Sequence, residues 1–191
     1  MYQLRGKLSI VMPAYNEEAL IYNSIMQTLS IVEQFAPDLE IIAVNDGSKD
    51  KTKQEIERAI RDDAKQPHPV VPGMRVSGTR IKLVTSNKNR GKGNAIISGI
   101  SQAEGDYIAF VDADLELNPA QLEGYLKKMQ ESGSDVVIGC KFHKDSELHY
   151  PFVRKVISLG YYMMLLVLFH LNVRDTCLLY TSPSPRDPKT S

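Results

Sequence analysis

The stretch Lys7-Leu-Ser-Ile-Val-Met-Pro-Ala-Tyr-Asn-Glu-Glu18 joins a mostly apolar run to a polar loop that opens on Pro13. A short apolar run is typical of a buried strand, and the proline predicts the end of that strand. The next segment, 17–35, carries apolar residues at the 3.6-residue spacing of an amphipathic helix. These features predict the first strand–helix unit of an α/β fold.

The same unit recurs along the rest of the chain. Further strands are predicted over 39–44, 81–85, 107–111 and 135–139. Helices are predicted between them, over 51–64, over 91–103 and from Pro119 onward. Strands that alternate with helices favour a mostly parallel, Rossmann-like sheet with helices on both faces.

The composition excludes several classes of protein. The chain has 191 residues, of which 42% are hydrophobic, enough for one domain with a core. Its 23 basic and 23 acidic residues balance, whereas a nucleic-acid-binding domain usually has a basic excess. Two cysteines without a CxxC pair argue against a disulfide scaffold and a zinc site.

Polar loops follow four of the predicted strands. Ligands of open α/β sheets bind beyond the carboxyl ends of the strands, so these loops are expected to share one rim. The loops cover 13–18, 45–48, 87–94 and 112–114.

The segment Asp112-Ala113-Asp114 is the strongest candidate for metal binding. In an extended chain both carboxylates point the same way and repel each other unless a cation joins them. Carboxylate oxygens suit Mg²⁺ or Mn²⁺, and Glu116 could extend the set. The alternatives are that Asp114 only caps the following helix or that both carboxylates are simply solvated.

The segment Gly91-Lys92-Gly93 is the candidate for binding an anion. It is not a P-loop, because Ser86 stands where that motif needs its first glycine. A lysine at a helix N-terminus can bind a phosphate together with the backbone N–H groups. A plain turn with a solvated Lys92 is the alternative.

The C-terminal part contains an apolar segment, 154–173, that begins with Arg154-Lys155. We favour a helix in a membrane interface, with its basic start among lipid headgroups, over a buried core helix or a membrane span. No signal peptide or N-x-S/T sequon is visible, so we expect the cytoplasmic face of a membrane.

The last fifteen residues, 177–191, have a different character. Residues 177–187 resemble, residue for residue, the translation of a transposase sequencing adapter. Our hypothesis is that the native part of this sequence is cut off after Thr176 by read-through into adapter and that 177–191 form a non-native, disordered tail. An ordinary Ser/Pro-rich tail is the alternative.

Taken together, the loops resemble the motifs of family-2 glycosyltransferases with the GT-A fold. The resemblance spans 8–176 and is strongest to polyprenyl-phosphate sugar transferases, the dolichyl-phosphate glucose and mannose synthases. The motifs are Val11-Met-Pro-Ala-Tyr-Asn-Glu-Glu18, Val44-Asn-Asp-Gly-Ser-Lys-Asp-Lys-Thr52, Asn89-Arg-Gly-Lys-Gly-Asn-Ala95, Val111-Asp-Ala-Asp114, Gly139-Cys-Lys141, Tyr150-Pro-Phe-Val-Arg-Lys155 and Val173-Arg-Asp-Thr176.

The resemblance implies an inverting transfer of a hexose from a nucleotide sugar, of the UDP-glucose or GDP-mannose type. Its implied nucleotide-binding residues are Pro13, Ala14, Tyr15, Glu17 and Asp46, the last at the base. Its implied metal ligands are Asp112, Asp114 and Glu116, and its implied acceptor-phosphate ligands are Lys141, Arg154 and Lys155. The family continues beyond the segment that ends at Thr176, so the domain over 1–176 is expected to be C-terminally truncated and could be inactive.

The expected chemistry follows from the leaving group and the acceptor. Charge that develops on the nucleoside diphosphate would be stabilised by the metal, with help from Lys92. A polyprenyl phosphate is already anionic near neutral pH and needs no general base. The open alternatives are a hydroxyl acceptor, a nucleotidyltransferase of related α/β fold and a non-catalytic binding module.

Overall fold

The computed structural model describes residues 2–67, 79–138 and 180–183. By its contacts the chain divides into two compact units, Met1–Val137 with Leu179–Ser191 and Ile138–Leu178. The elements are β1 (Leu8–Ala14), α1 (Ile21–Val32), β2 (Leu39–Asn45), α2 (Thr52–Asp63), β3 (Ile81–Thr85), α3 (Lys92–Ile100), β4 (Tyr107–Phe110), α4 (Gln121–Ser132), β5 (Val137–Ile138) and β6 (Tyr180–Pro183).

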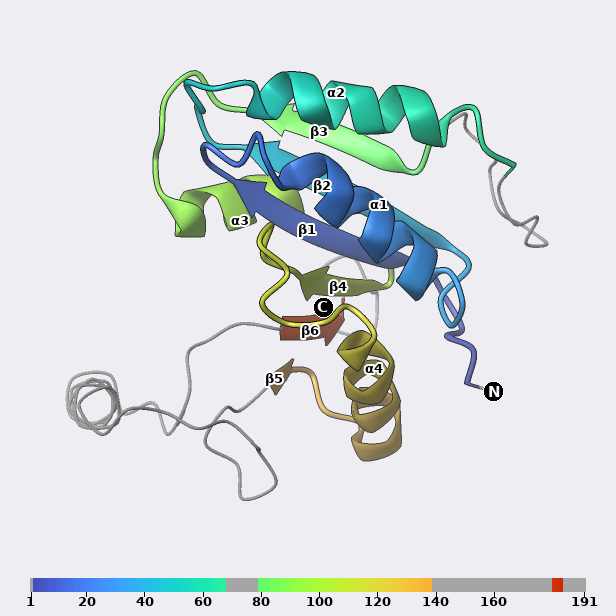
Figure 1. Ribbon diagram of the computed structural model, residues 1–191. Coiled ribbons are helices and arrows are strands. Elements are labelled where there is room, and N and C mark those ends of the chain that lie inside the picture. The colour runs from blue at the N-terminus through green and yellow to red at the C-terminus, as the bar shows by residue number, and fades with distance from the viewer. Residues whose placement is uncertain (1, 68–78, 139–179, 184–191) are drawn as a thin grey trace, which may run out of the picture. The chain divides into compact units, whose positions relative to one another are not determined.

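The predicted alternation of strands and helices is confirmed. Strands β3, β2, β1 and β4 lie side by side in this order and are all parallel (Figure 1). Leu8 of β1 pairs with Leu39 of β2 on one side and with Tyr107 of β4 on the other. The carboxyl ends of β1, β2 and β4 therefore meet at one edge, as the sequence predicted.

Strand β1 runs two residues past its predicted end at Met12 and includes Pro13. Proline cannot donate a backbone hydrogen bond and is normally confined to edge positions of a sheet. The pairing of β1 with β4 ends at Val11, whereas its pairing with β2 continues to Ala14. Beyond Val11 the strand therefore has a neighbour strand on one side only, and the proline is tolerated there.

Each face of the sheet packs against helices. Alternate residues of β1 point to opposite faces: Ile10 joins the core cluster that includes α1, α2 and α4, and Val11 joins the cluster that includes α3. Figure 1 shows α1 and α2 over the same face. On the other face, a Cβ at Gly99 of α3 would collide with Val11 and lie 3.1 Å from Val44, so glycine allows α3 close to the sheet.

The prediction that 177–191 form a non-native, disordered tail stays a prediction, because the structure describes only residues 180–183 of this segment. These residues form β6, antiparallel to β4, with Ala109 paired to Thr181 and Tyr107 to Pro183. Strand β1 covers only one side of β4, so the other side presents unpaired N–H and C=O groups that any extended segment can pair with. A segment without a strand-like sequence period can therefore become a strand here.

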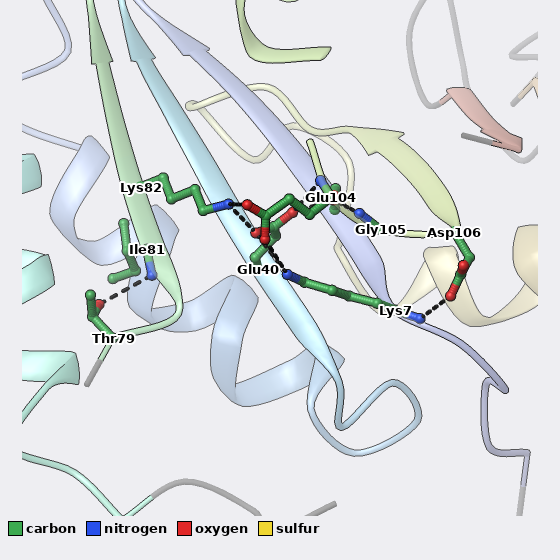
Figure 2. A network of polar contacts seen from close by, with 9 residues as sticks. Lys7, Glu40, Thr79, Ile81, Lys82, Glu104, Gly105 and Asp106 are labelled. Carbon is green, nitrogen blue, oxygen red and sulfur yellow. Dashed lines mark hydrogen bonds and ion pairs between the residues drawn. The ribbon is translucent and has the colours of Figure 1, made fainter. Parts of the chain in front are cut away.

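A cluster of charges lies where the strands begin, at the edge opposite their carboxyl ends (Figure 2). The carboxylate of Glu40 is buried and accepts a hydrogen bond from the Ser9 hydroxyl at 2.6 Å. It also accepts one from the backbone N–H of Glu104 at 2.8 Å. The ammonium groups of Lys7 and Lys82 lie 3.0 and 2.9 Å from it. This cluster joins β1, β2 and β3 to the loop before β4.

We expect Glu40→Gln to destabilise the protein by about 1–3 kcal/mol at neutral pH, because buried partners lose a charged acceptor. Burial opposes ionisation of Glu40, but hydrogen bonds from Ser9 and Lys82 outweigh it and hold the pKa below its ordinary 4.5. The stabilisation is therefore complete above pH 4.5 and is lost as the pH falls through the lowered pKa.

Urea unfolding of wild type and Glu40→Gln, followed by circular dichroism, tests this expectation. The difference in unfolding free energy should narrow as the pH drops below 4.5. Glu131→Gln, at an exposed position of α4, is the control and should show no such narrowing. If the difference in unfolding free energy stayed constant across the acid range, the ionised Glu40 carboxylate would not be the source of the stabilisation.

Among the described residues, no helix is long and apolar enough to cross a membrane. The predicted interface helix, 154–173, lies outside the described residues.

Candidate nucleotide-binding site

A pocket of about 340 Å³ lies at the carboxyl ends of β1, β2 and β4. Its walls are the loops that follow these strands and the start of α3. The lining residues are Pro13, Ala14, Tyr15, Glu17, Asp46, Asn89, Gly91, Lys92, Ala95, Asp112, Ala113 and Asp114. Every residue predicted from the sequence to bind the nucleotide is therefore in one pocket, although the segments are up to 100 residues apart in the chain.

The charges of this pocket do not balance. Four carboxylates line it, those of Glu17, Asp46, Asp112 and Asp114, against the single ammonium of Lys92. Burial, and then repulsion from the nearby Asp114 and Asp50, raises the pKa of Glu17. An anionic ligand would be repelled by this lining unless a cation came with it. The donor set, all carboxylate oxygens, fits a hard divalent cation such as Mg²⁺ or Mn²⁺.

Asp112 and Asp114 are not in an extended segment, which corrects the sequence-based argument for their common direction. Strand β4 ends at Phe110, and the N–H of Leu115 donates to the carbonyl of Asp112 at 3.1 Å. Residues 112–115 thus form a turn, and Leu115 has φ +50°. A positive φ is costly for a bulky residue and requires support from neighbouring structure. The turn, rather than strand alternation, brings both carboxylates to the pocket.

Glu116, the third predicted metal ligand, lies two residues after Asp114. It is absent from the residues that line the pocket, and its backbone N–H donates to Oδ1 of Asp114 at 3.1 Å. The turn at Leu115 interrupts the i, i+2 pattern, so the family resemblance is the remaining argument for Glu116 as a ligand. Within 2–67 and 79–138, no three His, Cys, Asp or Glu side chains lie close enough together to hold a metal ion. Only two of the three predicted ligands, Asp112 and Asp114, therefore line the pocket.

Lys92 is the first residue of α3, after Gly91 with φ +90°. Its ammonium lies 2.6 Å from Oδ1 of Asp112. The lysine side chain is half-exposed and pairs with Asp112, so the alternative of a plain turn with a solvated Lys92 stays open. Lys92 and the helix N-terminus both face the pocket lined by Asp112, as binding of a phosphate would require.

Asp46 has a structural role that the sequence did not reveal. Its side chain is buried, and its carboxylate accepts backbone hydrogen bonds from Arg90 at 3.1 Å and Gly91 at 2.8 Å. The neighbouring Gly47 has φ +70°, and a Cβ there would collide with the backbone of Lys88. Asp46 therefore holds the loop before α3 against the end of β2 and is also one of the residues that line the pocket.

The loops after β1 and β2 are tied together by reciprocal hydrogen bonds. The side-chain oxygen of Asn16 accepts a hydrogen bond from the backbone N–H of Lys49 at 2.9 Å. The backbone N–H of Asn16 donates to the Ser48 hydroxyl at 3.0 Å. The N–H of Glu17 donates to the Thr52 hydroxyl at 2.8 Å. These hydrogen bonds hold the side of the pocket that contains Tyr15 and Glu17 in place without a ligand.

Three predicted site residues, Lys141, Arg154 and Lys155, lie outside the described residues. Two pocket residues, Asn89 and Ala95, were not singled out from the sequence. Both belong to the motif around Lys92, so their place in that motif was the available signal.

The chain belongs to glycosyl transferase family 2, whose family model matches residues 9–177. It is similar to the undecaprenyl-phosphate 4-deoxy-4-formamido-L-arabinose transferase of Enterobacter sp. (strain 638), with 35% identity over 131 residues. That match covers 69% of this chain and 36% of the relative. The enzyme of the same name from Photorhabdus laumondii is 33% identical over 152 residues, covering 80% of this chain and 42% of the relative. The chain thus spans less than half the length of these relatives.

Solved structures share the fold. The mannosyltransferase of Pyrobaculum calidifontis, in complex with GDP-Man and Mn²⁺, has a TM-score of 0.58 at 23% identity, covering 74% of this chain and 37% of that one. Glucosyl-3-phosphoglycerate synthase of Mycobacterium tuberculosis, with Mn²⁺, UDP-glucose and phosphoglyceric acid, has a TM-score of 0.60 at 21% identity. That match covers 94% of this chain and 57% of the other. The architecture of this chain is the GT-A fold.

Proposed function

We propose that this chain is the donor-binding part of a glycosyltransferase that moves a hexose from a nucleotide sugar to a polyprenyl phosphate. The observation that carries the proposal is the pocket at the carboxyl ends of β1, β2 and β4, where carboxylates outnumber Lys92 four to one. A nucleoside diphosphate bound with a divalent cation suits this lining, and a free anion does not. The names of the undecaprenyl-phosphate relatives support a lipid-phosphate acceptor.

The residues of the pocket have separate tasks in this proposal. Asp46 would accept a hydrogen bond from the base, and Tyr15 and Glu17 would enclose the nucleotide on the wall fixed by the loops after β1 and β2. Asp112 and Asp114 would hold the cation, Mg²⁺ or Mn²⁺. When bound, this cation would stabilise negative charge on the departing diphosphate. Lys92 would add a second positive charge at the N-terminus of α3.

The acceptor would be held by Lys141, Arg154 and Lys155, on the basis of the sequence motifs. A phosphomonoester has a second pKa of about 6 and is anionic at neutral pH, so cations that orient it are sufficient and no general base is needed. An apolar segment next to Arg154 suits a substrate that resides in a membrane. We therefore propose that the enzyme works at the surface of a membrane.

Thermal unfolding of the 191-residue chain with UDP, GDP, UDP-glucose or GDP-mannose tests donor binding, with and without Mn²⁺. A ligand at about 100 times its dissociation constant adds roughly 2.7 kcal/mol of stability, which gives a readable shift. We expect a metal-dependent shift with one of the two bases. Absence of any shift in the folded chain would contradict the proposed donor site.

Transfer to the acceptor needs a second assay. Labelled glucose or mannose from the preferred donor should appear on undecaprenyl phosphate in detergent micelles once the chain is extended to full length. Transfer to a soluble sugar hydroxyl instead would replace the lipid-phosphate proposal by the hydroxyl-acceptor alternative. Release of pyrophosphate from a nucleoside triphosphate would identify a nucleotidyltransferase.

A further inference from the structure

A buried hydroxyl of α1 contacts the turn that carries the two carboxylates of the pocket. Ser24 is 5% exposed, and its Oγ donates to the backbone carbonyl of Ala113 at 2.5 Å. Ala113 lies between Asp112 and Asp114 in the chain and is itself buried. The contact joins residues 89 positions apart, so it ties the turn to a different element of the fold.

Other contacts also restrain the turn: the ammonium of Lys92 lies 2.6 Å from Oδ1 of Asp112, and Ala113 and Leu115 pack in the hydrophobic core. One backbone bond closes the turn, from Leu115 to Asp112, and one bond links the N–H of Glu116 to the Asp114 carboxylate. Leu115 adopts φ +50°, a conformation that surrounding contacts must enforce. Ser24 donates to the carbonyl of Ala113, which lies between Asp112 and Asp114 in the chain. The directions of these two carboxylates decide whether they can share a cation.

We propose that Ser24 is a positioning residue that fixes the direction of the Asp112 and Asp114 carboxylates toward a shared cation. This inference rests on the proposed function. A cation such as Mg²⁺ demands near-ideal ligand geometry, so a small rotation of the turn weakens binding strongly. Ser24 acts through the backbone of Ala113 and does not itself face the pocket.

The chain offers a matched control one helical turn away. Thr28 lies on the same face of α1 and is 0% exposed, and its hydroxyl has no hydrogen-bond partner in the described part of the structure. Ser24→Ala and Thr28→Val each remove one buried hydroxyl from this face. A general disturbance of α1 packing would affect both variants, whereas loss of the turn contact affects Ser24→Ala alone.

The first measurement is Mn²⁺ binding to the 191-residue chain by electron paramagnetic resonance, with UDP and with GDP as probes. We expect Ser24→Ala to weaken Mn²⁺ binding about 10- to 100-fold, the range found when groups that orient metal ligands are removed. Thr28→Val should bind as wild type does, and Ser24→Thr, which keeps a hydroxyl, should recover most of the affinity. Equal weakening by Ser24→Ala and Thr28→Val would overturn the inference.

The second measurement needs neither metal nor nucleotide. Amide hydrogen exchange at Leu115 and Glu116 should accelerate in Ser24→Ala and remain unchanged in Thr28→Val. Wild-type exchange rates in Ser24→Ala would overturn the inference even where nucleotide binding is intact. A wild-type chain that binds neither Mn²⁺ nor nucleotide would instead overturn the proposed function, and the exchange comparison would still decide whether Ser24 holds the turn.

Discussion

Asp112→Asn is expected to weaken metal-dependent nucleotide binding by roughly 100-fold or more, equivalent to about 2.7 kcal/mol. The substitution removes one of the two charges that line the pocket after β4 and leaves the shape of the side chain nearly unchanged. It also removes the partner of Lys92, whose ammonium lies 2.6 Å from Oδ1 of Asp112. Isothermal titration with UDP and GDP in the presence of Mn²⁺ measures the effect.

The stability of Asp112→Asn should change far less than its binding. Lys92 is half-exposed and Asp112 is partly exposed, and ion pairs of this kind contribute about 0–1 kcal/mol. Asp135→Asn, which alters an exposed carboxylate outside the pocket, is the control for the change in net charge. Unchanged affinity in Asp112→Asn would show that Asp112 does not hold the cation.

Asp63→Ala is expected to destabilise the protein by about 3–5 kcal/mol, the usual cost of removing one member of a buried ion pair. Asp63 is 0% exposed at the end of α2. Its carboxylate accepts a hydrogen bond from the guanidinium of Arg80 at 2.7 Å and another from the backbone N–H of Arg80 at 2.8 Å. Arg80, in turn, contacts Glu33 after α1 at 2.8 Å. The group ties α1, α2 and the start of β3 together.

The second variant for this prediction is Asp63→Ala combined with Arg80→Met. Removing both charges should restore part of the lost stability, because no unpaired buried charge remains. Urea unfolding followed by circular dichroism gives the free energies of unfolding. A single-variant loss below about 1 kcal/mol would mean that water replaces Asp63 at the guanidinium group.

The sequence predicted the order of the elements because apolar runs and helical periods are local signals. Strands 39–45 and 81–85 agree with the predictions to within one residue. The rim of polar loops followed from topology alone, since parallel strands place their carboxyl ends together. For the same reason the nucleotide-binding residues predicted from the motifs came together in one pocket.

Contacts between distant elements could not be predicted in this way. The turn at Leu115 depends on a positive φ that the residue type does not predict. The bond from Ser24 to Ala113 joins a helix residue to a loop 89 positions away, and a serine in an amphipathic helix gives no sign of such a partner. Residues 180–183 pair with the free edge of β4, and their own sequence shows no strand period.

The two ends of β2 carry different kinds of chemistry. Glu40 near its start belongs to the charge cluster of Figure 2, and Asp46, just past its end, belongs to the pocket. The strand between them spans about 20 Å at the usual rise per residue. Sites this far apart without shared partners affect stability additively. Substitutions in the cluster at Glu40 should therefore change the thermal stability of the protein independently of substitutions in the pocket at the other end of the same strand.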